Sequence, residues 1–273
     1  MRQVPLRANA LVGSVLVGAV VAMALLSALW TPRNPLAVAL RQRLKPPSAE
    51  YWLGTDEVGR DVLSRLMQGA GTSVLVASLT ILVAVALGSL TGLLAGFLRG
   101  WVDRTLMAVN DTLLAFPGIL LALGLMTVFG ASQWGIVMAL GLAYAPGVAR
   151  IVRGTVLSLR EREFIEASRA IGNGEGYTLW RHVLPNIVSP VIVLATSMFG
   201  WAILSESALS FLGLGVPPPA PTWGNMLAAS RPYLESALWL SLAPGLCIAL
   251  TLLGTNLLGD ALRDRLDPRS EAR

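Results

Sequence analysis

Long apolar segments alternate with short polar ones along most of this chain. A helix crosses the hydrocarbon core of a bilayer with about 20 apolar residues, because each residue adds about 1.5 Å of length. The segments that approach this length lie at Ala10–Trp30, Thr72–Leu98, Thr105–Gly130, Ser132–Ala149, Asn186–Phe211 and Ser236–Gly259. The pattern predicts an all-α, polytopic membrane protein with six transmembrane helices.

The third and fourth segments form one apolar stretch whose only charged residue is Asp111. This stretch is about twice as long as one span requires. We therefore divide it at Phe129–Gln133, where glycine, serine and glutamine favour a turn.

The first segment follows Arg2 and Arg7, as the apolar part of a cleavable signal peptide would. That part usually has about 7–15 residues, fewer than here, and Trp30-Thr31-Pro32 is a poor cleavage site. We favour a retained first helix, with cleavage as the alternative.

The spans divide the chain into three parts. Residues 1–71 hold the first helix and an outer loop, residues 72–259 form a five-helix core with a cytoplasmic loop at 150–185, and residues 260–273 form a charged cytoplasmic tail.

The composition supports a membrane protein. Hydrophobic residues make up 54% of the chain and charged residues 14%, where soluble proteins carry roughly a quarter charged residues. A soluble core of this size could not hide so much apolar surface, so lipid must surround most of the chain.

The basic residues indicate the orientation. With the amino terminus inside, 14 of the 21 basic residues lie in cytoplasmic segments and seven lie outside. This distribution places both termini in the cytoplasm. It also explains the net charge of +5 without binding to a nucleic acid.

Several kinds of chemistry are excluded by missing residues. The only lysine, Lys45, follows a leucine, so the chain has no Gly-x-x-x-x-Gly-Lys loop for ATP phosphates. The single His182 and the single Cys247 cannot build a His/Cys metal site or an internal disulfide. Serines in the spans have no base in reach, so we expect no enzymatic activity.

The polar loop between the fourth and fifth spans has a pattern of its own. Helix-forming residues from Arg160 to Ile171 end at Gly172, a favoured helix terminator. A flexible turn follows, and a second short helix over Tyr177–Val183 is expected to stop at Pro185 before the fifth span. From composition alone, an ordinary solvated hairpin would be an equally good interpretation.

The spacing in this loop favours a more specific interpretation. The order Glu-Ala-Ser-x-x-x-Gly, nine residues, then His-x-Leu-Pro resembles the signature Glu-Ala-Ala-x-x-x-Gly-x(9)-Ile-x-Leu-Pro of ATP-binding-cassette (ABC) importer permeases. Ser168 replaces the second alanine, and His182 replaces isoleucine. The loop residues that the resemblance marks, with their charged neighbours, are Glu163, Glu166, Ala167, Ser168, Arg169, Gly172, His182, Leu184 and Pro185.

A second motif lies in the outer loop, where Leu53–Arg65 reads Leu-Gly-Thr-Asp-x-x-Gly-Arg-Asp-x-x-Ser-Arg. Apolar residues at helical spacing and the pairs Asp56/Arg60 and Asp61/Arg65 predict an amphipathic helix on the outer membrane surface. The string also resembles the dipeptide/oligopeptide/nickel branch of these permeases. Further matches to that branch lie at Leu114–Pro117, Glu206–Gly215, Pro221–Gly224 and Gly259–Arg269.

The resemblance implies a type I ABC-importer permease fold and a subunit that imports peptides by alternating access. The implied partners are a second, related permease, two ATPase subunits that hold ATP and magnesium, and an extracytoplasmic solute-binding protein. The implied location is the bacterial plasma (inner) membrane, with no cofactor in this chain. The helix around Glu166 would insert into a cleft of an ATPase subunit and transmit its movement to the spans.

Glycines and acids inside the spans suggest further roles. Gly88, Gly92 and Gly96, followed by Gly100, form a small face that favours close helix packing, within the chain or against a second permease. Asp111 and Glu206 should face protein or a water-filled path, because a carboxylate facing lipid costs several kcal/mol. Structural hydrogen bonding is the favoured role for Glu206, and contact with a peptide amine is the alternative.

The main alternative class is a self-sufficient secondary transporter or channel. Such a protein usually shows charges along a pathway and internal repeats, and this chain shows neither clearly. Within the ABC architecture, nickel complexes, glutathione or oligosaccharides are alternative substrates.

Overall fold

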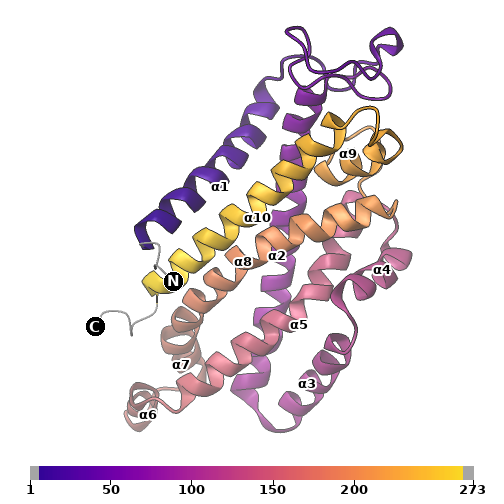
Figure 1. Ribbon diagram of the computed structural model, residues 1–273. Helices are drawn as coiled ribbons and strands as arrows, with labels where there is room; N and C mark the ends of the chain where they lie inside the picture. Colours follow the sequence, from indigo (N-terminus) through magenta and orange to yellow (C-terminus); the bar gives the residue numbers. More distant parts are fainter. Residues whose placement is uncertain (1–5, 267–273) are drawn as a thin grey trace.

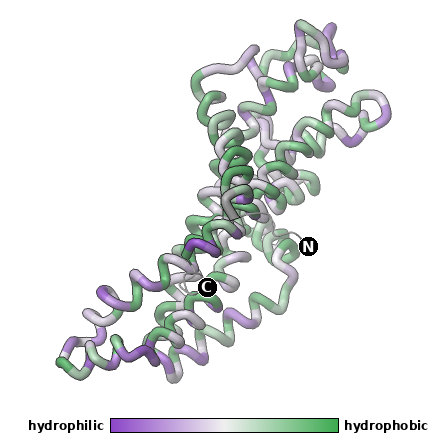
Figure 2. The backbone as a smooth tube through the Cα atoms, turned by 60° about the vertical axis from the view of Figure 1, so that its left-hand side comes forward, coloured by the Kyte–Doolittle hydropathy of each residue, from purple (hydrophilic) through white to green (hydrophobic). Residues whose placement is uncertain are grey.

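The computed structural model describes residues 6–266, and helices make up most of this range. Long helices run along the molecule, short ones lie at its two ends and along one side (Figure 1), and polar segments gather towards the ends (Figure 2). The long helices are α1 (Leu6–Leu29), α2 (Val62–Leu98), α5 (Gln133–Arg160), α8 (Leu184–Phe211) and α10 (Trp239–Leu266). The others are α3 (Gly100–Leu114), α4 (Gly118–Phe129), α6 (Glu163–Ala170), α7 (Glu175–Thr178) and α9 (Trp223–Ser230), with helical turns at Leu40–Gln42, Leu179–Val183 and Arg231–Tyr233.

Within residues 6–266, five helices are long and apolar enough to cross a membrane, or six if α3 and α4 count as one span. This arrangement confirms the all-α, polytopic architecture. We call the two ends of the bundle the α6 end and the α9 end.

The predicted third span, Thr105–Gly130, is not one straight helix. It consists of α3 and α4, which meet at an angle of 98°. The break falls at Ala115-Phe116-Pro117, where Pro117 is extended (ψ 128°) and caps α4. Proline cannot donate an amide hydrogen and disfavours a helical residue before it, so a helix cannot continue through this position.

The amphipathic stretch of the outer loop is also different from the prediction. It forms the first turns of α2, which begins at Val62 instead of Thr72, and is not a separate surface helix. Asp61 starts α2, because its carboxylate accepts hydrogen bonds from the Ser64 amide at 2.8 Å and the Ser64 hydroxyl at 2.6 Å. The predicted pair Asp61/Arg65 therefore does not form. The Asp61 carboxylate caps a helix, and Arg65 contacts Asp56 at 3.3 Å.

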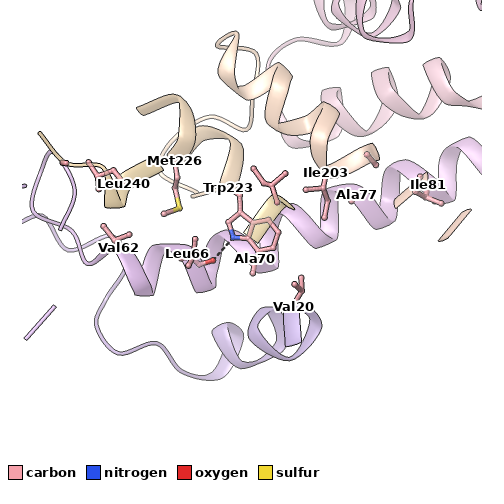
Figure 3. Packing of buried hydrophobic residues seen from close by; sticks show 13 residues of the cluster. Val20, Val62, Leu66, Ala70, Ala77, Ile81, Ile203, Trp223, Met226 and Leu240 are labelled. Atoms are coloured by element: carbon pink, nitrogen blue, oxygen red, sulfur yellow. Dashed lines mark hydrogen bonds between the residues drawn. The ribbon is translucent and has the colours of Figure 1, made fainter. Parts of the chain in front are cut away.

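Burial explains why this stretch joins α2. Val62 and Leu66 are buried in a cluster with Trp223 and Met226 of α9 (Figure 3). The Trp223 indole Nε1 donates a hydrogen bond to the Leu66 carbonyl at 3.0 Å. The apolar stripe is thus covered by protein at the α9 end, where a lipid surface was predicted.

The glycine face of α2 packs against α5. A Cβ atom on Gly88 would lie 2.5 Å from the Val148 Cβ, and one on Gly92 would lie 2.5 Å from the Ala149 carbonyl oxygen. Gly96 has a similar contact with Val156 at 2.9 Å. Only glycine permits this approach, which brings the two backbones into van der Waals contact. The face therefore serves packing within the chain, while Gly100 opens α3 and meets nothing within 4 Å.

Replacing Gly92 with leucine should lower the stability of the protein by about 1–3 kcal/mol, the usual cost of overpacking a tight contact. Gly245 of α10 has open space around it, so Gly245→Leu is the matched control and should unfold like the unmodified protein. Thermal unfolding of the purified proteins measures the difference. Equal Tm values for the two variants would contradict the close α2–α5 contact.

Candidate functional site

The residues singled out in the polar loop come together at the α6 end. We call residues 163–185 the α6–α7 element; it comprises α6, α7, the turn Leu179–Val183 and the start of α8. Glu163 and Glu166 lie in the first turn of α6, where the positive end of the helix dipole favours acidic side chains.

A buried side chain holds α6 against the long helices. Ile165 is completely buried and packs in one cluster with Val156 of α5, Val183 of the following turn and Ile187 of α8. Removal of a buried isoleucine typically costs about 2–5 kcal/mol. Ile165 therefore fixes α6 to both of the long helices that flank the element.

Ser168 connects α6 to the segment that follows it. Its buried hydroxyl lies 3.2 Å from the Thr178 hydroxyl, and the Asn173 side-chain amide donates a hydrogen bond to it at 3.1 Å. An alanine, as in the family signature, could make neither bond. In this chain the serine thus adds polar links across the turn.

Gly172 ends α6 through its backbone conformation. Its φ of +88° is in the left-handed region, which favours glycine. The Gly172 amide donates to the Arg169 carbonyl at 2.9 Å and the Asn173 amide donates to the Ser168 carbonyl at 3.1 Å. These two bonds form a Schellman motif, which satisfies the last carbonyls of the helix.

His182 contacts two aromatic rings. The centroid of its ring is 6.1 Å from that of Phe164 and 6.0 Å from that of Tyr177. Edge-on aromatic contacts at such distances are favourable. The imidazole ring of His182 therefore packs against aromatic side chains at the position where the family signature has isoleucine.

Pro185 does not stop the second helix, contrary to the prediction. One helix runs from Glu175 to Phe211, and Leu179–Val183 is a π-helical turn in which the Leu184 amide donates to the Leu179 carbonyl. The π-helical turn directly before Pro185 is wider than an α-helical turn, which makes room for the proline ring where it would otherwise meet the carbonyl four residues earlier. The α6–α7 element is thus joined to α8 without an interruption.

The outer surface of the element carries both charged and apolar groups. Glu163, Glu166 and Ala167 are exposed, and Arg169 forms an ion pair with Glu175 at 3.2 Å. Apolar side chains are exposed beside them: Phe164 42%, Ile171 79%, Tyr177 52% and Trp180 72%. Large apolar side chains exposed beside charged ones make this surface a candidate interaction site.

The sequence reasoning did not identify Trp180 or the link through Thr178. Both lie in the stretch of nine residues that the signature leaves unspecified. The helical period from Tyr177 onward could have placed Trp180 beside Tyr177, but no local signal shows which side of such a short helix is covered.

Asp111 and Glu206 lie outside the α6–α7 element. Asp111 of α3 forms an ion pair with Arg150 of α5 at 2.7 Å, and both side chains are 61% exposed. Glu206 is completely buried near the α9 end, where the Ser210 hydroxyl donates a hydrogen bond to its carboxylate at 2.8 Å.

Together, these features define a class of protein: a polytopic helical membrane protein with a polar, anchored element that protrudes from one end. Comparison with known proteins agrees. Residues 88–271 match the family described as binding-protein-dependent transport system inner membrane component. The chain belongs to this family, and is an inner-membrane permease of an ABC importer.

Individual relatives support the assignment. The chain is 41% identical to a dipeptide transport system permease protein, DppC, of Alkalihalophilus pseudofirmus, over 96% of this chain and 86% of the relative. It is 42% identical to a putative peptide transport system permease protein of Brucella suis, over 94% and 87%. A glutathione transport system permease protein, GsiD, of Pectobacterium atrosepticum is 42% identical over 82% of this chain and 74% of that protein.

The fold is also similar to a solved structure. The chain matches a chain of the MetNI methionine ABC transporter in an inward-facing conformation with a TM-score of 0.61 and 18% identity, over 74% of this chain and 96% of that chain. At 18% identity, this similarity shows a shared fold and nothing further. The family as a whole works with ATPase subunits and an extracytoplasmic binding protein.

Replacing Gly172 with alanine should loosen the end of α6. A residue with a side chain costs about 1–2 kcal/mol in the left-handed region, and nothing lies within 4 Å of the new Cβ, so the cost is conformational. Hydrogen exchange of the backbone amides of residues 168–176 should become about 5–30-fold faster.

Gly174→Ala is the matched control, because Gly174 has a φ of −64° and equally open surroundings. Its exchange rates should stay close to those of the unmodified protein. Equal effects at the two glycines would rule out the strain argument.

Proposed function

We propose that this chain is the permease subunit of an ATP-driven importer for peptides. The observation that carries the proposal is the high identity to peptide permeases over nearly the whole chain. The glutathione relative fits the same class, because glutathione is a tripeptide. Nickel complexes and other solutes are the alternative substrates.

The α6–α7 element is the proposed contact with an ATPase subunit. Its exposed apolar side chains supply contact area, and Glu166 supplies a charge for an arginine of the ATPase. Ile165 and the continuous α7–α8 helix would then pass the movement of the ATPase to α5 and α8. Such coupling requires a rigid connection and would drive alternating access.

The proposed assembly has a second, homologous permease, two ATPase subunits and a solute-binding protein. The pathway lies between the two permeases, so both contribute to it. In this scheme the chain performs no catalysis and holds no cofactor, since ATP and magnesium bind to the ATPase subunits.

The proposed location is the bacterial plasma membrane, with both termini in the cytoplasm. The distribution of arginines supports this orientation. It places the α6–α7 element in the cytoplasm, where an ATPase could reach it, and the outer loop and α9 on the outside.

Reconstitution tests the proposal directly. The chain, its second permease, the ATPases and the binding protein are placed in proteoliposomes, and uptake of a labelled dipeptide is measured with ATP and without it. Uptake that requires ATP and the binding protein supports an ABC importer. Uptake by the chain alone without nucleotide would establish a secondary transporter or channel.

Glu166→Arg should separate ATP hydrolysis from transport in this system. We expect uptake to fall at least about tenfold, as loss of a charged contact implies, while the assembled complex still hydrolyses ATP. Glu235→Arg introduces the same change at an exposed residue of the α9 end and should leave the ratio of uptake to hydrolysis unchanged. Normal uptake by Glu166→Arg would remove Glu166 from the coupling surface.

The orientation is tested with single cysteines in a Cys247→Ser background. A membrane-impermeant maleimide should label Ala49→Cys of the outer loop in intact cells. It should label Gly176→Cys of the α6–α7 element only after the membrane is permeabilised. Both positions are exposed, so the reverse result would invert the proposed topology.

A further inference from the structure

A groove lies between α5, α8 and α10 towards their α6 ends. It consists of two cavities of about 490 and 680 Å³ that share the lining residues Ile151, Ser189, Pro190 and Leu266. We call this surface the α5–α8–α10 groove. Its size is within the range of pockets that hold small organic molecules, about 300–1,000 Å³.

Arginines line both parts of the groove. Arg263 lines one cavity, and Arg150 and Arg162 line the other. Within residues 6–266, no acidic side chain lines either cavity. The Asp111 carboxylate, which comes from α3, contacts Arg150, but such an exposed ion pair is weak. The groove is therefore positively charged and should attract an anionic group.

The wall between the arginines has both polar and apolar groups. Asn186 and Ser189 of α8 line it beside Val193 and Leu194 of the same helix. This combination matches a short peptide, which carries a carboxylate, amide groups and side chains. It matches a lipid chain less well, because polar groups contribute nothing to the binding of hydrocarbon.

The position of the groove also connects it to the α6–α7 element. Its α8 wall belongs to the helix that runs without interruption from Glu175 to Phe211, and Arg162 directly precedes α6. A movement of the α6–α7 element would therefore move one wall of the groove relative to α10.

We infer that the α5–α8–α10 groove contacts the transported peptide near the cytoplasmic mouth of the pathway, with Arg263 binding its C-terminal carboxylate. Guanidinium groups suit this role because they bind carboxylates through two parallel hydrogen bonds. The inference rests on the proposed peptide importer and adds a site within this subunit.

Protection of a cysteine from alkylation tests the site. Ser189→Cys, in a Cys247→Ser background, is prepared as the full transporter complex without nucleotide, in nanodiscs of neutral phosphatidylcholine. The dipeptide Ala-Phe is added directly and the binding protein is omitted, so that the binding protein cannot select the ligand. Labelling by N-ethylmaleimide is timed with Ala-Phe, with its C-terminal amide and with neither.

We expect saturating Ala-Phe to slow labelling of Ser189→Cys by about fivefold, which corresponds to occupancy of most sites. The amide should slow it less than twofold, because it lacks the carboxylate. Arg263→Gln in the same background should raise the concentration for half-protection about tenfold. Val188→Cys is the matched control; it is the preceding, exposed residue of α8 outside the groove, and its labelling should not change.

Equal protection by the acid and the amide would overturn the carboxylate contact. Protection by added phosphatidylglycerol but not by Ala-Phe would show that the groove binds a lipid. Labelling that occurs only in the isolated permease would show that the second permease covers the groove in the complex.

The unmodified complex, tested for ATP-driven Ala-Phe uptake with its binding protein, separates the two proposals. Uptake without protection of Ser189→Cys would overturn the proposed peptide site in the groove but would leave the proposed importer function standing. Absence of uptake would count against the importer, and with it against this inference.

Discussion

Close contact between α2 and α5 is the constraint on which the rest of the structure depends. Three glycines of α2 remove the side chains that would keep the two backbones apart. In lipid, apolar residues gain nothing by leaving the solvent, so dispersion contacts between closely fitting helices supply the attraction. The α2–α5 pair therefore provides a firm support for the remaining helices.

The α6–α7 element depends on this support. Ile165 packs against α5 on one side and α8 on the other, so the short helix α6 has a fixed position relative to both. The π-helical turn keeps the chain helical past Pro185. A force applied to a short helix on a flexible loop would bend the loop and would not reach the long helices. The α6–α7 element is attached to long helices at both of its ends.

At the α9 end, buried polar groups add directional contacts to the packing: Asp61 caps α2, Asp56 contacts Arg65, and the Trp223 indole binds the Leu66 carbonyl. Each contact is specific in direction, since a hydrogen bond requires an aligned donor and acceptor. The loop before α2 is thus held to the α9 end of the bundle, while the α6 end presents an exposed surface.

The sequence by itself determined the class of fold, most of the spans and the residues of the α6–α7 element. Apolar length, the Gly172 terminator and the signature spacing are local properties, and a linear pattern records them. Tertiary structure decided the bend at Pro117, the burial of the amphipathic stretch under α9, the passage of the helix through Pro185 and the partner of the α2 glycines. Each of these outcomes depends on which groups, distant in the chain, cover a given side chain or relieve a given clash, and that information arises only when the helices pack.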